Sequence, residues 1–289
     1  MTGSSIVHEL GDPDGFAVVF HNGTPCSGLV AEWWDAQARK RGLRLIGIDR
    51  PGYGNAPAAP GRSLCSVAEA TAALMNHLDI DRFAVVGVSG GGPYALACGA
   101  VLPDRVVAII SGAGSSGFDE AIDGHQFEAE ELELTREQAL RPTPEGRQAL
   151  ARFYDPEIEN LRRADVDAFM SWVGEDPVAA TPEQRETAAY VLEAVKAGVR
   201  PGRDGWLDDG LAMLRPWGFE LAGIRQPVAV WHSRDDTMVS IEHGRRLVAA
   251  IPNAEPFLVD DLGHGGVCCR QEVPMFDWIV SKVPMAGRA

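Results

Sequence analysis

Short runs of apolar, often β-branched residues alternate with longer amphipathic segments through the first part of the chain, and the same pattern returns near its C-terminus. The runs are apolar throughout, which is typical of strands that are covered on both faces of a parallel sheet. Strands that alternate with helices of roughly 10–15 residues indicate right-handed βαβ units. The sequence therefore predicts a mostly parallel α/β fold. The expected strands are Phe16–Phe20, Leu43–Arg50, Phe83–Val88, Arg105–Gly114, Gln226–Ser233 and Ala254–Asp260.

The segments between these runs predict the helices that cover the sheet. Leu74 and Leu78 stand four residues apart, as expected for one face of a helix. Another helix is expected to begin immediately after the glycines that follow the strand at Phe83–Val88. The expected helices are a segment through Trp33, Trp34 and Ala38, then Val67–Leu78, Tyr94–Val101, Glu242–Ala250 and Arg270–Val283.

Residues 115–223 break the alternation. They contain charged, alanine-rich segments punctuated by proline, and no run that resembles a strand. Thr181 before Pro182, and Asp165 before Val166–Trp172, are typical helix-start signals. The first part of this stretch, 119–133, is strongly acidic, which favours a solvated face or a mobile entry segment. We therefore expect a helical insertion over 115–223, placed in a core whose two parts, 1–114 and 224–289, join into one sheet.

Composition narrows the possible partners. The 289 residues are 45% hydrophobic and 23% charged, as in an ordinary globular protein with a substantial core. The net charge of −15 argues against a nucleic acid and against an anionic membrane surface, since both attract basic proteins. A small-molecule substrate is the expected partner, for a monomer or a homodimer.

We expect no signal peptide, and the cysteines suit a reducing compartment. The N-terminal stretch "MTGSSIVHELGDPDG" lacks the basic and apolar regions of a signal peptide. The five cysteines are odd in number and form no C-x-x-C pair, and we expect the neighbours Cys268 and Cys269 to be packed, unbridged thiols. A cytoplasmic location is expected. No H-E-x-x-H motif or ligand cluster indicates a metal, and no cofactor is expected.

Candidate chemistry begins at "VVGVSGGGPYALA", where the expected strand at Phe83–Val88 meets the following helix. Gly87-Val88-Ser89-Gly90-Gly91 matches G-x-S-x-G in the strand–turn–helix setting that this motif requires. A serine lifted out of a tight turn needs flanking residues without side chains, which Gly87 and Gly91 supply. The Gly90 amide at the helix N-terminus is placed to donate to a developing oxyanion. The alternative, a phosphate-binding loop, lacks both G-x-x-x-x-G-K-[ST] and G-x-G-x-x-G.

A serine nucleophile needs a base, and the base needs an acid to orient it. His264 lies between glycines just after the last expected strand, whereas His232 ends a strand and is expected to be a packing residue. Asp235 and Asp236 follow the preceding strand, at the carboxyl end where α/β sites form. Both aspartates also fit an ordinary surface turn. The remaining histidines considered are expected at the surface: His8, His77, His125 and His243.

These segments together resemble the α/β-hydrolase superfamily over nearly the whole chain. "VVFHNGTPCSG" is similar to its oxyanion loop, "IDRPGYGNA" to its D-x-x-G-x-G-x-S loop, and "GVSGGGPYALA" to its nucleophile elbow. "PVAVWHSRDDTMVS" is similar to its acid loop and "DLGHGG" to its histidine loop. The chain order serine, aspartate, histidine is also that of the superfamily.

The resemblance implies roles for individual residues. Asp236 is the implied acid, because it stands three residues after Ser233, where the family usually has glycine; Asp235 stays open as an alternative. Thr24 would give the second oxyanion amide beside Gly90, and Asn22 stands where the family usually has histidine. For Gly92, which neither motif role requires, we expect a close approach of the oxyanion loop or of substrate.

The resemblance further implies a serine hydrolase of the capped type. The expected reaction is hydrolysis of a carboxylic ester, in preference to an amide, of a small apolar compound through an acyl-enzyme on Ser89. An acyltransferase, a cofactor-free perhydrolase and a non-hydrolytic ligand-binding protein are the alternatives. Ser89 argues against haloalkane dehalogenases and soluble epoxide hydrolases, which use aspartate there, and the elbow does not clearly match proline iminopeptidases or carbon–carbon bond hydrolases.

Residues 115–223 would then form a cap over the site. Aromatic side chains of this segment are candidates for lining an apolar pocket, and the alternative is that they only hold the cap to the core. The residues that we take as substrate-binding candidates are Trp172, Trp206 and Trp217.

Overall fold

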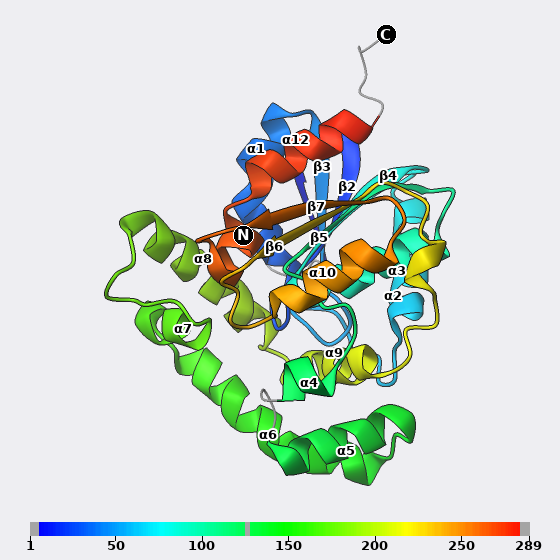
Figure 1. The fold of residues 1–289 in the computed structure, drawn as a ribbon. Coiled ribbons are helices and arrows are strands. Elements are labelled where there is room, and N and C mark those ends of the chain that lie inside the picture. Colours follow the sequence, from blue (N-terminus) through cyan, green and yellow to red (C-terminus); the bar gives the residue numbers. More distant parts are fainter. Residues whose placement is uncertain (1–5, 125–127, 284–289) are drawn as a thin grey trace.

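The structure is a computed structural model that describes residues 6–124 and 128–283 (Figure 1). Within these residues, seven strands form one sheet in the order β1-β3-β2-β4-β5-β6-β7. Only β1 runs antiparallel to its neighbour β3, and the other described pairs are parallel. The strands are β1 (Val7–Gly11), β2 (Phe16–His21), β3 (Leu43–Ile48), β4 (Phe83–Val88), β5 (Val106–Gly112), β6 (Val228–Ser233) and β7 (Ala254–Val259).

All six expected strands are present, and β5 pairs with β6, so the two parts of the core do join into one sheet. The alternation of side chains explains why the runs are apolar throughout. Along β4, Ala84 and Val86 pack in the cluster on one face of the sheet, while Phe83 and Val85 pack in the cluster on the other. The prediction missed β1, which is a short edge strand with intermediate and exposed positions and therefore lacks a continuous apolar run.

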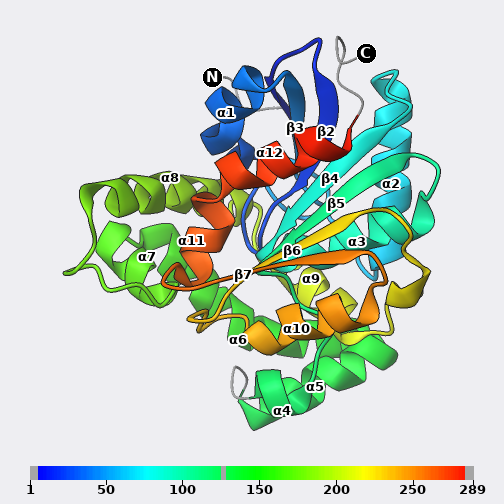
Figure 2. The same cartoon turned by 45° about the horizontal axis from the view of Figure 1, so that its top comes forward.

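Helices cover both faces of the sheet (Figures 1 and 2). The 3₁₀ helix η1 (Gly28–Trp34) with α1 (Asp35–Lys40), and α12 (Glu272–Lys282), pack on one face. On the other face lie α2 (Leu64–His77), α3 (Gly92–Val101) and α10 (Ile241–Ala250). The expected helices are thus all found, and an additional one, α11 (Gly263–Cys269), occupies the place of an expected turn.

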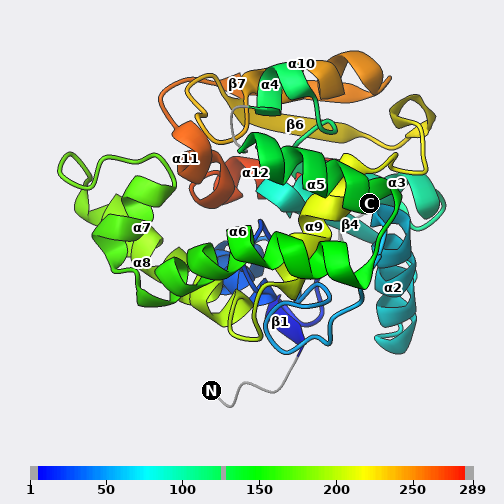
Figure 3. The ribbon, with the colours of Figure 1, turned by 90° about the horizontal axis from the view of Figure 1, so that it is seen from below.

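The described residues between 115 and 223 form helices and no strand. Figure 3 shows α5 and α6 in front of the sheet when the molecule is viewed from below, with α7 and α8 to one side of it. Both helix-start signals are confirmed, because the side chains of Thr181 and Asp165 accept hydrogen bonds from the amides of Gln184 and Ala168. The inserted helices are α4 (Glu120–Asp123), α5 (Ala129–Leu140), α6 (Pro144–Arg163), α7 (Val166–Trp172), α8 (Pro182–Gly198) and α9 (Asp204–Leu214).

Two further features concern this scaffold. All five cysteines are free thiols. Within the described ranges, none of the helices is both long enough and apolar enough to cross a lipid bilayer.

Candidate active site

Ser89 stands at the turn between β4 and α3, with the 3₁₀ helix η2 (Ser89–Gly91) between them. Its φ of 51° lies in the left-handed region, which is strained for a residue with a side chain. A Cβ on Gly87 would come within 2.2 Å of the Gly91 carbonyl oxygen, and one on Gly91 within 2.0 Å of the His21 carbonyl oxygen. The prediction that these two glycines make room for the turn is confirmed.

The expectation for Gly92 is wrong. Gly92 is buried, and a Cβ there would lie 2.8 Å from Ser111 Oγ and 2.9 Å from Gly114 Cα. Both atoms belong to the end of β5 and the residues that follow it, and neither to the oxyanion loop. Gly92 is therefore required by the packing of α3 against the neighbouring strand.

His264 and Asp236 lie beside Ser89. His264 Nε2 is 3.0 Å from Ser89 Oγ, and His264 Nδ1 is 2.8 Å from Asp236 Oδ2. The other oxygen of Asp236 accepts hydrogen bonds from the backbone amides of Met238 and Val239, at 2.9 and 2.8 Å. Burial raises the pKa of Asp236, but the hydrogen bonds from His264 and Val239 outweigh it and hold that pKa below its usual value. Asp236 is therefore a charged acceptor that orients the imidazole of His264.

The neighbouring Asp235 is exposed, and its carboxylate binds a backbone amide. Its Oδ2 accepts the amide of Asp261 at 2.5 Å, in the loop that leads to His264. Ser233 also joins the two loops, because its hydroxyl oxygen accepts the amide of Gly263 at 3.1 Å. The serine in place of the usual glycine thus helps to hold the histidine loop against the acid loop.

The other histidines differ in their surroundings. His232 is buried and bonded through Nε2 to the Val239 carbonyl at 2.8 Å, in agreement with a packing role. The surface prediction for His243 is wrong: it is fully buried, because α4 docks on α10 and brings Asp123 within 2.9 Å of His243 Nε2. His77 is exposed and His8 is half-buried, while His125 lies outside the described residues.

The loop after β2 lies directly against the elbow. A Cβ on Gly90 would come within 2.4 Å of Thr24 Oγ1, and one on Gly23 within 3.2 Å of Ser89 Cβ. The structure thus places both residues expected at the oxyanion hole next to Ser89. The buried amide of Asn22 donates to the carbonyl oxygens of Gly23, at 3.2 Å, and of Cys26. Asn22 therefore shapes this loop from within.

Asp209 of α9 is a buried residue that was not among the expected site residues. Burial raises its pKa, but the guanidinium groups of Arg50 and Arg62 outweigh burial and hold the pKa of Asp209 well below its usual value. An aspartate pair inside an apolar helix, "DGWLDDGLAML", was the available signal, but its partners come from distant segments. Its donors are Thr24 Oγ1 at 2.6 Å, Tyr53 Oη at 2.8 Å, Tyr94 Oη at 2.6 Å, Arg50 at 2.5 Å and Arg62 at 2.6 Å.

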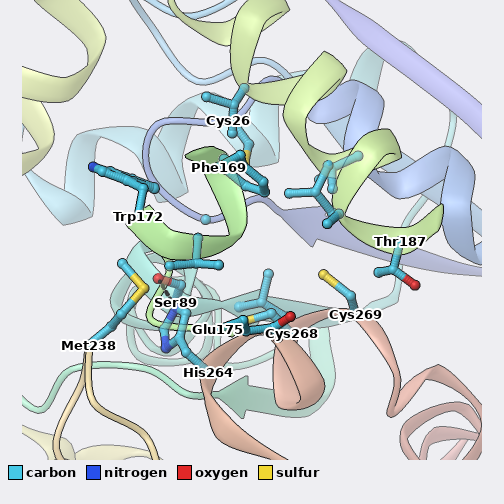
Figure 4. Close-up of a pocket in the computed structure, with 18 of the residues that line it drawn as sticks. Cys26, Ser89, Phe169, Trp172, Glu175, Thr187, Met238, His264, Cys268 and Cys269 are labelled. Atoms are coloured by element: carbon cyan, nitrogen blue, oxygen red, sulfur yellow. Dashed lines mark hydrogen bonds between the residues drawn. The ribbon is translucent and has the colours of Figure 1, made fainter. Parts of the chain in front are cut away.

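A cavity of about 760 Å³, including its opening to solvent, begins at Ser89 and His264 (Figure 4). It is mostly apolar, and three cysteines contribute to its wall. Burial raises the pKa of Cys26 and of Cys269 to about 12, and raises that of Cys268 well above its usual value. These thiols stay protonated near neutral pH and act as apolar lining.

A second cavity, of about 980 Å³ including its opening to solvent, also reaches Ser89. Trp172 lines both cavities and Trp206 lines the second. Trp217 lies outside both, because its indole donates to the Met213 carbonyl and its ring packs against Phe219. No group of side chains in the described residues is arranged to hold a metal ion.

The sheet, the elbow and the arrangement around Ser89 together define a class. The chain belongs to the alpha/beta hydrolase fold family, whose sequence profile matches residues 17–267.

Curated relatives carry several names. A 2-hydroxy-6-oxononadienedioate/2-hydroxy-6-oxononatrienedioate hydrolase of Cupriavidus pinatubonensis is 27% identical over 229 residues, 77% of this chain and 70% of that protein. The dihydrolipoyllysine-residue acetyltransferase component of the acetoin cleaving system of Pseudomonas putida is 27% identical, over 89% of this chain and 60% of that protein.

Solved structures share the fold. A thermophilic esterase from Thermogutta terrifontis has a TM-score of 0.66 at 20% identity, covering 95% of this chain and 92% of that one. The enol-lactonase from Burkholderia xenovorans LB400 has a TM-score of 0.65 at 17% identity, covering 95% of this chain and 94% of that one.

Proposed function

We propose that this protein is a serine hydrolase that cleaves a carboxylic ester of a small, largely apolar compound through an acyl-enzyme. The observation that carries the proposal is the chain of contacts from Ser89 Oγ to His264 Nε2, and from His264 Nδ1 to Asp236. The proposed base thus lies within hydrogen-bond reach of both the nucleophile and the orienting acid, as acyl transfer by serine requires.

In the proposed reaction, Ser89 Oγ forms a bond to the ester carbonyl carbon while its proton passes to His264 Nε2. The amides of Gly90 and Thr24 bind the oxyanion, and each such donor contributes about 3–4 kcal/mol of transition-state stabilisation. The carbon–oxygen bond then breaks, and His264 returns its proton to the departing alcohol. Water, activated by His264, releases the acid from Ser89, and Asp236 holds the imidazole tautomer throughout.

The lining of the first cavity supports a substrate without a strong negative charge. The name of the Cupriavidus relative denotes a dicarboxylate, and such a substrate would need cationic partners. Among the described residues that line this cavity, Arg270 is the sole arginine or lysine, and Glu175 stands 4.0 Å from it. We therefore place the substrate closer to those of esterases, with residues 115–223 as the cap over the site.

The test combines active-site labelling with ester turnover. Ser89→Ala should abolish labelling by a fluorophosphonate probe and hydrolysis of p-nitrophenyl esters. Asp236→Asn should lower kcat roughly 10⁴-fold, because the wrong imidazole tautomer would be held. Asp235→Asn is the matched control and should retain activity, because its carbonyl oxygen can still accept the Asp261 amide.

Full labelling of the Ser89→Ala protein would overturn the assignment of the nucleophile. Acyl transfer to an added alcohol or amine at the expense of hydrolysis would identify an acyltransferase instead. Tight metabolite binding without turnover above the Ser89→Ala background would identify a binding protein.

A further inference from the structure

The two cavities at Ser89 differ in which part of the proposed machinery they contain. Thr24, Ser89, Trp172 and Met238 line both, so these residues mark where the cavities meet. Figure 4 shows Trp172 and Met238 at the Ser89 end of the first cavity, with Thr187 and Cys269 toward its far end.

His264 lines the first cavity, and Gly90 lines the second. Among the described lining residues, neither of these two is shared between the cavities. This division separates the proton donor for the leaving group from the elbow amide that binds the carbonyl oxygen.

We propose that the alcohol part of the ester occupies the first cavity and the acyl part occupies the second. This assignment rests on the proposed function. The leaving oxygen has to lie near His264 Nε2 to receive the proton, so the group attached to it extends into the cavity that His264 lines. The carbonyl oxygen has to reach the Gly90 amide, so the acyl chain extends into the cavity that Gly90 lines.

The polar groups of the second cavity define the acyl group further. Asp123 and His243 are the sole titratable side chains among the described residues that line it, and they lie 2.9 Å apart. Among donors in the described residues, His243 bonds to Oδ1 of Asp123, and the Asp119 amide bonds to Oδ2 at 2.8 Å. A carboxylate offers about four acceptor positions, so Asp123 can accept another donor.

The acyl chain that suits this cavity is therefore apolar near the carbonyl and carries a hydroxyl or ammonium group at its far end. No arginine or lysine is found among the lining residues in the described part of the chain, so a terminal carboxylate would face Asp123 without a cation. The first cavity, with its protonated thiols, suits an apolar alcohol.

Two isomeric esters test which part of the ester enters which cavity. Ethyl hexanoate has a long acyl chain and hexyl acetate has a long alcohol. The two esters have the same molecular formula and a similar hydrophobicity. Leu214→Trp should partly fill the second cavity and lower kcat/KM about tenfold for ethyl hexanoate, with hexyl acetate little affected. Val191→Trp should fill the first cavity and give the opposite selectivity.

The outcomes separate this assignment from the proposed function. The reversed pattern, or equal losses for both esters in both variants, would overturn the assignment while ester hydrolysis stands. Absence of hydrolysis of both esters by the wild-type enzyme would overturn the proposed function and the assignment with it.

A second series tests the role of Asp123. Ethyl 6-hydroxyhexanoate, ethyl heptanoate and monoethyl pimelate differ only in a terminal hydroxyl, methyl or carboxylate group. The wild-type enzyme should prefer the hydroxyl ester to the carboxylate ester by about tenfold or more, and Asp123→Asn should bring that ratio close to one. Glu120→Gln, on the same helix but exposed, is the control and should leave the ratio unchanged. A wild-type preference for the carboxylate, or an unchanged ratio in Asp123→Asn, would contradict this role.

Discussion

The hydroxyl of Thr24 donates a hydrogen bond to Oδ2 of Asp209 over 2.6 Å. Thr24 belongs to the loop beside the elbow, and Asp209 belongs to α9 of the inserted segment. Arg50 strengthens the connection, since it donates both to Thr24 Oγ1 at 3.2 Å and to Asp209. The inserted helices therefore hold the loop that contains Thr24 directly.

We predict that Thr24→Val lowers kcat about tenfold or more with little change in KM, because a hydrogen bond to a charged group stabilises by about 1.5–3 kcal/mol. Thr24→Ser keeps the hydroxyl and should retain most of the activity. Steady-state kinetics with one p-nitrophenyl ester, together with thermal unfolding, would separate the two variants. Equal activity of the valine and serine variants would show that the Asp209 contact does not position this loop.

Gly92 gives a second prediction. Gly92→Ala should lower the free energy of unfolding by about 1–3 kcal/mol, because its Cβ meets Ser111 and Gly114 closer than 3.0 Å. Gly223→Ala is the control, since nothing lies within 4 Å of a Cβ there. It should change the free energy of unfolding by less than about 0.5 kcal/mol. Urea unfolding measures both. If Gly92→Ala instead kept full stability and lost activity, a contact with substrate would explain this glycine better than packing.

The buried His21 gives a prediction about pH. Burial and the nearby Arg50 lower its pKa to about 3 in the folded protein, from 6.5 when unfolded. Between these values only the unfolded state binds the proton, so the stability present above pH 6.5 is lost as the pH falls. From pH 7 to pH 5 this amounts to roughly 2 kcal/mol.

Urea unfolding of wild type and His21→Asn at both pH values tests this prediction. The variant should lose less stability than the wild type over that interval, by about the amount given above. Identical pH dependence of the two proteins would mean that His21 is protonated, or exposed, in the folded state.

Much of the fold and of the site was readable from local signals. The six expected strands stood out because both faces of the sheet are covered, so that residues such as Val85 and Val86 are apolar although they point to opposite sides. The turn at Ser89 could be predicted because Gly87 and Gly91 stand within two residues of it, at positions where a side chain would collide with the backbone. Each of these signals depends on neighbours along the chain.

What the sequence left open depends on contacts between distant segments. That Asp236 and not Asp235 contacts His264 follows from the direction of one loop relative to another, since Asp235 turns to the Asp261 amide. The burial of His243 requires α4 to dock on α10, and the position of Trp217 outside both cavities depends on how α9 and the residues after it pack. Such contacts form between segments that are far apart in the sequence, and they depend on the free energy of the whole packed molecule. A local sequence pattern therefore does not predict them.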